Sequence, residues 1–226
     1  LPGLGPLPLR RREDGFSAIL NAVVSQQLST HAADAIGARL DAAGLTDPAA
    51  IALASDEALR ACGLSAQKIR YLRGIAAAAP DWAALRTLPD EDVTQTLVAL
   101  PGIGQYTARA VACFAYGKNV PVVDTNVRRV VARVERGEAL GKPGKKEIDE
   151  VAQLLPAQNG PEFSVGLMEL GALVCTSRSP QCGVCPVRAE CAWLAAGQPA
   201  AEAPKRSQKF AGTDRQVRGK IMRVLR

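Results

Sequence analysis

Apolar residues recur every three or four positions from Phe16 to Leu40, which is the spacing of a buried helix face and predicts two helices there. Similar spacing, interrupted by Gly, Pro or Asp, predicts further helices over residues 48–53, 56–62, 66–79, 90–99, 147–155 and 161–174. No segment alternates apolar and polar residues as a half-buried strand does. The chain is therefore expected to be all-α, with an irregular Pro-, Gly- and Arg-rich lead-in over residues 1–14.

The stretch from residue 93 to 115 predicts a helix, a short break and a second helix that begins near Gln105. The break runs Leu100-Pro101-Gly102-Ile103-Gly104, and its two glycines allow a tight turn and a close approach of the backbone to a ligand. The amides that open the second helix would suit an anion such as phosphate. An ordinary turn between two packed helices explains the same pattern equally well.

A short extended run, residues 120–123, leads to Asp124 and then to a predicted helix with Val127, Val130, Val131 and Val134 on one face. Taken alone, Asp124 is predicted to be the N-cap of that helix, because a carboxylate there accepts backbone amides and suits the helix dipole. Residues 137–146 are rich in Gly, Pro and Lys and predict a loop.

Four of the six cysteines follow the spacing Cys-x6-Cys-x2-Cys-x5-Cys, and they are Cys175, Cys182, Cys185 and Cys191. Prolines within the segment keep it from becoming helical, and thiolates this close together suit a metal centre. A cytoplasmic chain is not expected to form disulfides. The spacing leaves both zinc and an iron–sulfur cluster open.

The remaining cysteines, Cys62 and Cys113, fall on apolar helical segments and are expected to be buried structural residues. The only histidine, His31, cannot by itself build a histidine-based hydrolytic metal site or a Ser-His pair. We expect it to be a surface or packing residue.

Composition adds limits on partners and location. The chain has 226 residues and a formal net charge of +6, and residues 205–226 carry eight basic residues against one acidic residue. Such a tail could follow phosphates, although a solvated charged face explains it as well. Aromatic residues make up 4% of the chain, too few for single-strand stacking platforms, which favours duplex DNA. Without a long apolar run or a signal-peptide pattern, we expect a soluble, cytoplasmic protein.

Three motifs occur in order: residues 100–108 of the hairpin, Val122-Val123-Asp124-Thr125-Asn126-Val127-Arg128-Arg129, and the cysteine segment. Together they resemble the endonuclease III and MutY branch of the helix–hairpin–helix DNA glycosylases, over residues 16–195. Residues 97–218 are most similar to bacterial adenine glycosylases of the MutY type. Residues 16–30 look more like endonuclease III or the 3-methyladenine glycosylases.

The resemblance implies two helical lobes with a DNA groove between them. Residues 15–117 would form a helical barrel lobe with the hairpin, residues 1–14 and 118–195 an iron–sulfur lobe, and residues 196–226 a basic tail. The four cysteines would hold a structural [4Fe-4S] cluster, and Arg178 in the first cysteine interval would contact phosphate. The protein would be a bacterial monomer associated with the nucleoid.

The same resemblance assigns site residues. Asp124 would be the catalytic carboxylate that stabilises positive charge on the sugar and orients water. The hairpin would contact DNA through Gly102, Gly104, Gln105 and Thr107. Once the damaged base leaves the stack, Gln27 would fill the gap and Leu64 would wedge the opposite strand.

Tyr106 departs from the bifunctional endonuclease III pattern, because the lysine that forms a Schiff base stands at this position in those enzymes. A phenol cannot form that imine, so the resemblance predicts a monofunctional hydrolase with absent or weak lyase activity. Lys118, Lys142 and Lys145 are the alternative amines for a weak lyase.

Ala22, or Asn21 in an adjacent register, stands where adenine glycosylases have a glutamate general acid. Without an acid, adenine is a harder leaving group. We therefore expect a pyrimidine substrate, such as uracil or thymine opposite guanine or an oxidised pyrimidine. Adenine excision of the MutY type and a catalytically weak DNA-binding relative are the alternatives.

Overall fold

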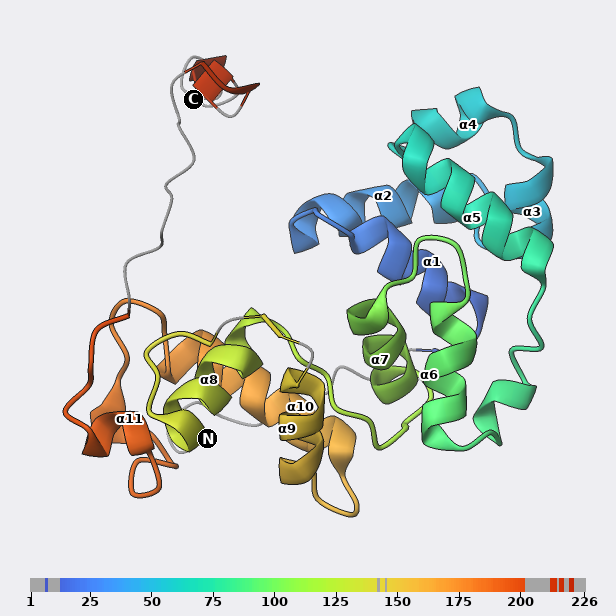
Figure 1. The fold of residues 1–226 in the computed structure, drawn as a ribbon. Coiled ribbons are helices and arrows are strands. Elements are labelled where there is room, and N and C mark those ends of the chain that lie inside the picture. The colour runs from blue at the N-terminus through green and yellow to red at the C-terminus, as the bar shows by residue number, and fades with distance from the viewer. Residues whose placement is uncertain are drawn as a thin grey trace.

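The computed structural model describes residues 7, 13–141, 143–144, 146–201, 212–214, 216–217 and 220–221. Within these residues the chain is helical and contains no strand, which confirms the predicted all-α fold. The α-helices, labelled as in Figure 1, are α1 (Phe16–Ser25), α2 (Thr30–Ala42), α3 (Pro48–Leu53), α4 (Asp56–Ala61), α5 (Ala66–Ala78), α6 (Asp90–Val98), α7 (Gln105–Phe114), α8 (Thr125–Arg136), α9 (Glu147–Leu154), α10 (Gly160–Glu169) and α11 (Ala192–Ala195). Short turns of other helix types cover Ala84–Arg86, Leu170–Val174 and Cys182–Val184.

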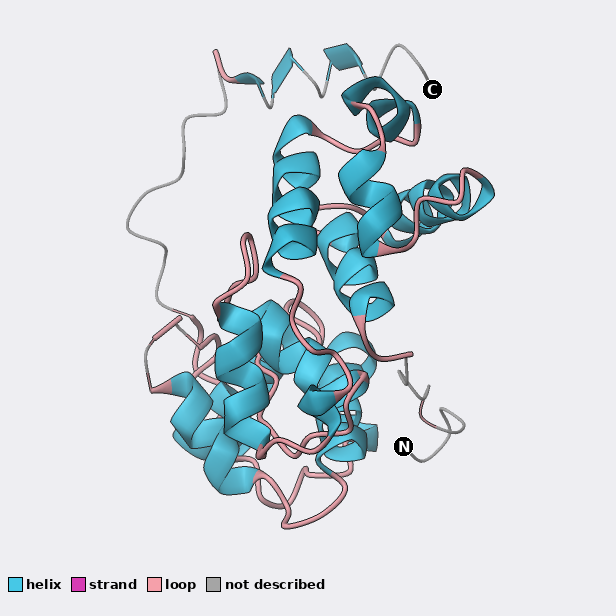
Figure 2. Ribbon diagram, turned by 90° about the vertical axis from the view of Figure 1, so that its right-hand side faces the viewer, coloured by secondary structure: helices cyan, strands magenta, loops and turns pink. Residues whose placement is uncertain are grey.

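The helices gather into two groups (Figures 1 and 2). Helices α1 to α7 lie on one side and α8 to α11 on the other, and residues 117–124 cross between them without helix. The two lobes share one core, since Val127 of α8 and Met168 of α10 belong to the same buried cluster as Ile19 and Leu97. Two lobes are thus observed, while their predicted residue boundaries remain a prediction.

Side-chain caps explain where many of these helices begin. Ser29, Asp47, Ser55 and Ser65 each accept a backbone amide of the helix that follows. Such caps satisfy N–H groups that lack a partner in the first turn, so the helix start is set by the local sequence. This is why the predicted starts at 48, 56 and 66 agree with the structure.

The predicted helix over residues 161–174 differs in its last turn. The α-helical bonding stops at Glu169, and a wider π-helical turn, Leu170–Val174, continues to Cys175, whose amide donates to the Leu170 carbonyl at 2.7 Å. Gly171 lies against α8, where a Cβ would come within 2.6 Å of the Asn126 Cβ. The wider turn changes the direction in which Cys175 leaves the helix.

A second, smaller apolar cluster holds the cysteine segment on α8. Val130 of α8, Leu170 and Val174 form its buried centre, and Cys175 and Cys185 pack against it. The basic stretch over residues 205–226 lies largely outside the described residues. Within the part of the chain that is described, no helix is both long and apolar enough to cross a membrane.

Candidate functional site

Gly102 allows the turn between α6 and α7. Its φ is +75°, a left-handed conformation that glycine adopts without strain. A Cβ at this position would lie 2.3 Å from a ring carbon of Tyr71 on α5. Gly102 is therefore required by the fold, both by its backbone conformation and by the aromatic ring that covers it.

Gly104 is different, because nothing in the fold requires a glycine there. Its φ of −89° is ordinary for any residue, and a Cβ would meet no atom within 4 Å. Gly104 is the N-cap of α7, and no side chain caps that helix. Gly104 and Gln105 are exposed at this helix start, and the N-terminus of a helix favours an anion.

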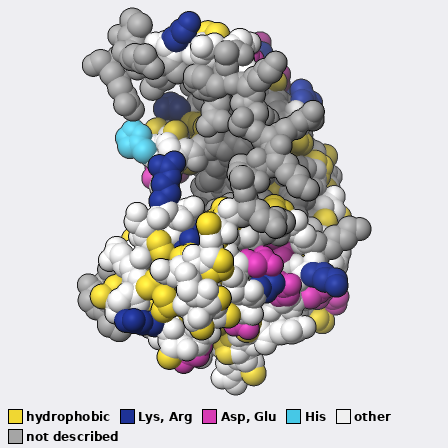
Figure 3. All heavy atoms as spheres, turned by 60° about the vertical axis from the view of Figure 1, so that its left-hand side comes forward, with side chains coloured by type: hydrophobic (Ala, Val, Ile, Leu, Met, Phe, Trp, Pro, Cys, Tyr) yellow, Lys and Arg dark blue, Asp and Glu magenta, His cyan; other side chains and the backbone are white. Residues whose placement is uncertain are grey.

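The predicted contact residues of the hairpin lie around this helix start. Gln105 is exposed and Thr107 is partly exposed, and Tyr106 is 50% exposed. Figure 3 shows Lys and Arg side chains scattered among hydrophobic and acidic ones on the described part of one face. A continuous basic stripe is not seen on that part of the face.

The loop between α1 and α2 lies beside the hairpin. The Gln26 side-chain amide donates to the Gly102 carbonyl at 3.0 Å, which brings the following residue, Gln27, close to the turn. Gln27 is exposed, with a left-handed φ of +58°. The neighbouring Leu28 is 42% exposed.

Leu64 does not occupy the predicted wedge position. Its side chain is only 3% exposed and belongs to the main core, because Leu64 follows α4 and packs inward at the turn before α5. A leucine in the core cannot enter a base stack without leaving that core. The expectation for Leu64 is therefore corrected.

Asp124 is the N-cap of α8, as its position in the sequence predicts. One carboxylate oxygen accepts the amides of Asn126 at 2.8 Å and Val127 at 2.7 Å. The other oxygen accepts the Asn126 side-chain amide at 3.2 Å. The carboxylate is partly exposed, so it is held in one orientation while solvent can still reach it.

Arg129 joins Asp124 to the cysteine segment. Its guanidinium donates to the Asn126 side-chain oxygen at 2.8 Å, to the Cys175 carbonyl at 2.7 Å and to the Gly171 carbonyl at 2.6 Å. Burial lowers the pKa of Arg129 from its ordinary value. Sequence reasoning missed Asn126 and Arg129, because both stand within a motif that offers no local sign of their long-range contacts.

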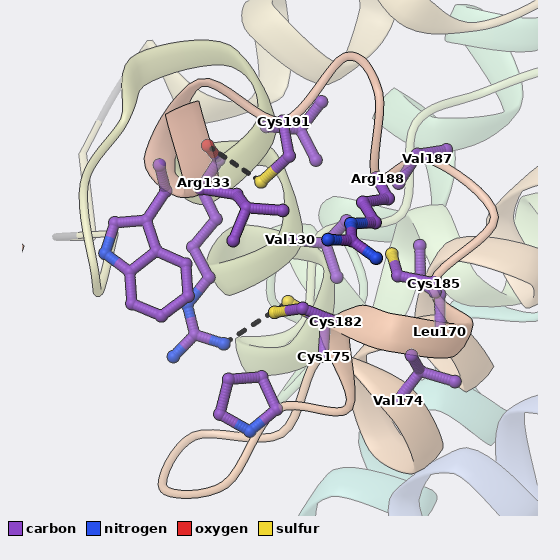
Figure 4. Close-up of a pocket in the computed structure, with 14 residues that line it drawn as sticks. Val130, Arg133, Leu170, Val174, Cys175, Cys182, Cys185, Val187, Arg188 and Cys191 are labelled. Carbon is purple, nitrogen blue, oxygen red and sulfur yellow. Dashed lines mark hydrogen bonds between the residues drawn. The ribbon is translucent and has the colours of Figure 1, made fainter. Parts of the chain in front are cut away.

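The four predicted cysteine ligands line one pocket, shown in Figure 4. Among the described residues, no three His, Cys, Asp or Glu side chains converge closely enough to hold a single metal ion. Four thiolates around one pocket are the ligand set of a [4Fe-4S] cluster. The donor set therefore fits an iron–sulfur cluster.

Arg133 adds a buried positive charge beside this pocket. Arg133 is only 2% exposed. Its guanidinium donates to the Cys175 sulfur at 3.3 Å and to the Thr176 carbonyl at 2.8 Å. It also lies 4.4 Å from the centre of the Trp193 ring. Within the described residues no carboxylate pairs with it, so thiolates are the anions that would balance its charge.

The two cysteines outside the cysteine segment, and one of the three alternative lysines, are buried. Cys62 and Cys113 are buried, as predicted, and burial raises the pKa of Cys113 to about 12. Lys118 is also buried, with its ammonium donating to the Arg86 and Leu88 carbonyls at 3.0 and 2.6 Å. This corrects the expectation that Lys118 is an available amine, because the fold already uses it.

Three predicted residues remain. Arg178 is exposed in the interval between the first two cysteines, where a phosphate could reach it. Lys142 and Lys145 lie outside the described residues. The structure thus brings the hairpin and Gln27 together, and separately joins Asp124 to the cysteine segment.

Two family profiles match the chain. The first, the HhH-GPD superfamily base excision DNA repair protein, covers residues 20–157. The second, the iron–sulfur binding domain of endonuclease III, covers residues 175–191, which include all four cysteine ligands. Because the first match spans more than half of the sequence, the chain belongs to the HhH-GPD superfamily, and its cysteine segment is an iron–sulfur binding domain of the endonuclease III type.

Individual relatives divide between two kinds of glycosylase. An adenine DNA glycosylase of Mycolicibacterium smegmatis is 60% identical over 132 residues, 58% of this chain and 45% of that protein. A thymine/uracil-DNA glycosylase of Methanothermobacter thermautotrophicus is 35% identical over 101 residues, 44% of this chain and 46% of that protein. The chain thus spans about half the length of these relatives.

A solved structure supports the fold. The structure of a thermostable thymine-DNA glycosylase superposes with a TM-score of 0.66 and 23% identity, over 86% of this chain and 91% of that chain. Identity this low bears on the arrangement of helices alone, and it agrees with the two-lobe helical fold.

We expect the same substitution to have opposite effects on the free energy of unfolding at the two hairpin glycines. Gly102→Ser should lower the free energy of unfolding by about 1 to 3 kcal/mol, because of its positive φ and the Tyr71 ring. Gly104→Ser should raise it by roughly 0.5 kcal/mol, because serine is a good N-cap, yet weaken duplex binding about tenfold by taking the amides of α7. Denaturant unfolding and fluorescence anisotropy would measure both, and tight duplex binding by Gly104→Ser would contradict the assigned phosphate contact.

The cysteine assignment predicts which substitution removes iron. Cys182→Ala should eliminate most of the bound iron, because the cluster loses one of its four ligands. Cys113→Ala is the matched control and should retain iron, because Cys113 lies in the core with a pKa of about 12. Metal analysis of protein purified without oxygen distinguishes the outcomes. Stoichiometric zinc in place of iron would refute the cluster.

Proposed function

We propose that the chain is a monofunctional DNA glycosylase that hydrolyses the N-glycosidic bond of adenine in mismatched duplex DNA. The observation that carries this choice of base is the 60% identity over 132 residues with an adenine DNA glycosylase. That similarity outweighs the preference for pyrimidines expected from the missing general acid. Adenine therefore replaces a pyrimidine as the first candidate.

Asp124 performs the main electrostatic task in this mechanism. As the base departs, positive charge builds on the sugar, and a carboxylate held in a fixed orientation stabilises it. The hydrogen bonds from Asn126 and Val127 hold the Asp124 carboxylate without neutralising it. The partly exposed carboxylate also orients the water that attacks the sugar carbon.

Tyr106 and Lys118 support hydrolysis without strand cleavage. A lyase needs an amine that attacks the sugar and forms an imine, and the phenol of Tyr106 lacks one. Lys118 has its ammonium bonded to two carbonyls in the interior. Attack by water is the reaction that this set of residues favours.

The iron–sulfur cluster has a structural part in the proposal. When bound, it supplies four thiolate linkages that fold the cysteine segment. Arg133 balances the thiolate charge and Arg129 connects the segment to the residue beside Asp124. The cysteine segment then presents Arg178 at the surface for phosphate.

A pyrimidine is the second candidate, and the composition of α1 favours it. No acidic residue occurs in Phe16–Ser25, so α1 provides no carboxylic acid to protonate a purine. Uracil and thymine leave as stabilised anions with less need of a proton. The 35% identity with a thymine/uracil-DNA glycosylase agrees with this alternative.

A panel of duplexes tests the proposed function. We expect release of adenine opposite 8-oxoguanine or guanine in preference to uracil, thymine, thymine glycol or alkylated purines. Strand breaks should appear only after hot alkali, because no imine forms. Asp124→Asn should abolish release, by about a thousandfold or more for a lost electrostatic group, while duplex affinity and folding persist because asparagine also caps helices. Release by Asp124→Asn, or covalent trapping with borohydride, would contradict the mechanism.

The missing acid predicts a gain of function from Ala22→Glu. Ala22 lies near the end of α1, four positions before its C-cap residue Gln26, whose side chain reaches the Gly102 carbonyl. A glutamate there should accelerate adenine release by about tenfold or more, with a rate that falls as that carboxylic acid ionises.

Asn21→Glu tests the adjacent register of the resemblance, because it places the same carboxylic acid at the neighbouring, exposed position. Single-turnover rates across pH would measure both variants. Equal acceleration of adenine and uracil release would show that the added glutamate does not act as an acid toward the purine.

A further inference from the structure

The loop over residues 26–29, between α1 and α2, adopts an unusual backbone conformation. Gln27 has a φ of +58° and is exposed. Residues other than glycine rarely adopt this left-handed conformation, and they keep it only where neighbouring contacts enforce it. The contacts that hold this loop therefore indicate what it is built to present.

Lys68 of α5 provides the most direct of these contacts. Its ammonium donates to the Val24 carbonyl at 2.6 Å and to the Gln26 carbonyl at 3.0 Å. These carbonyls end α1, where a positive charge is favourable. The lysine is half-buried, and burial lowers its pKa. Its own amide donates to Ser65, the N-cap of α5, so the backbone that carries the ammonium is also held.

Two further contacts hold the ends of the loop. Gln26 donates its side-chain amide to the Gly102 carbonyl of the hairpin at 3.0 Å. Ser29 accepts the Ala32 amide at 3.3 Å and so begins α2. Between these anchors only Gln27 and Leu28 project outward, and Leu28 is 42% exposed.

We propose that Lys68 is a positioning residue for DNA recognition, which holds the loop so that Gln27 and Leu28 are ready to enter an opened base pair. The inference rests on the proposed function, because it requires that the hairpin face contacts duplex DNA. A loop already fixed in its bound conformation loses less conformational entropy on binding. Lys68 thus increases affinity for DNA with a gap in its stack, without contacting the DNA.

The chemistry of lysine suits this task. An ammonium has three donors, so that of Lys68 can donate to the Val24 and Gln26 carbonyls at once. Lys68→Met keeps an apolar side chain of similar length and removes the donors and the charge. Lys68→Arg keeps both the charge and several donors. Arg70→Met is the matched control, because Arg70 is an exposed cation on the same helix and pairs with Gln67 rather than with the loop.

The experiment measures the affinity of the full chain, with its cluster intact, for two duplexes at one ionic strength. One duplex contains a tetrahydrofuran abasic-site analogue and the other is fully paired. Lys68→Met should weaken binding to the abasic-site duplex about tenfold, while affinity for the paired duplex changes less than about twofold. Lys68→Arg should restore most of the loss, and Arg70→Met should leave the ratio of the two affinities unchanged.

Equal weakening on both duplexes, or the same loss in Arg70→Met, would overturn the inference, because it would reflect a general loss of positive charge. Thermal unfolding accompanies each measurement. If Lys68→Met does not fold, Lys68→Gln replaces it and should show the same selective loss. A fluorescent base analogue opposite the abasic site should report less unstacking in the variant that lacks the ammonium.

This test is separate from the test of base removal. Binding to a stable abasic-site analogue needs no glycosidic chemistry. A chain that removes no base but shows the Lys68-dependent selectivity would refute the proposed function and support the inference. If the wild-type chain removes bases but the Lys68→Met variant binds both duplexes as tightly as the wild type does, the proposed function is supported and the inference is refuted.

Discussion

The buried guanidinium of Arg129 is the interaction on which the site depends most. It donates at once to the Asn126 side chain, the Cys175 carbonyl and the Gly171 carbonyl. A buried cation is unfavourable unless its donors are satisfied, so α8, the π-helical turn and the first cysteine must keep their relative positions. Asn126, whose side-chain oxygen accepts from Arg129, donates its side-chain amide to the carboxylate of Asp124 and so helps to fix its orientation. The cysteine segment is therefore part of the framework that holds the candidate catalytic group.

Backbone carbonyls organise the hairpin side of the other lobe. The Gly102 carbonyl accepts the side-chain amide of Gln26, and the carbonyls at the end of α1 accept the ammonium of Lys68. The hairpin and the loop that carries Gln27 are consequently one unit. Gly102 and Gln27 both have a positive φ. Gly102 adopts it without strain because it has no Cβ, whereas neighbouring contacts impose it on Gln27.

The errors of prediction have a common physical origin. The resemblance placed Leu64 in the DNA, but its side chain is in the core. Lys118 was one of three alternative amines for a weak lyase, but its ammonium is bonded to carbonyls of residues about thirty positions away. The end of the helix over 161–174 was missed because the π-helical turn accompanies a close contact of Gly171 with α8. Each depends on residues distant in sequence, which local patterns do not contain.

By itself, the sequence determined the helical fold, most helix boundaries, the N-cap at Asp124 and the set of four cysteine ligands. These features rest on periodicity, on caps that bond within three residues, and on ligand spacing along a short segment. Tertiary structure alone decided the contacts of Arg129, Arg133 and Lys68, because each side chain donates to a carbonyl or a sulfur at least forty positions away. The cysteine segment was recognisable from spacing, whereas its connection to Asp124 required the folded chain.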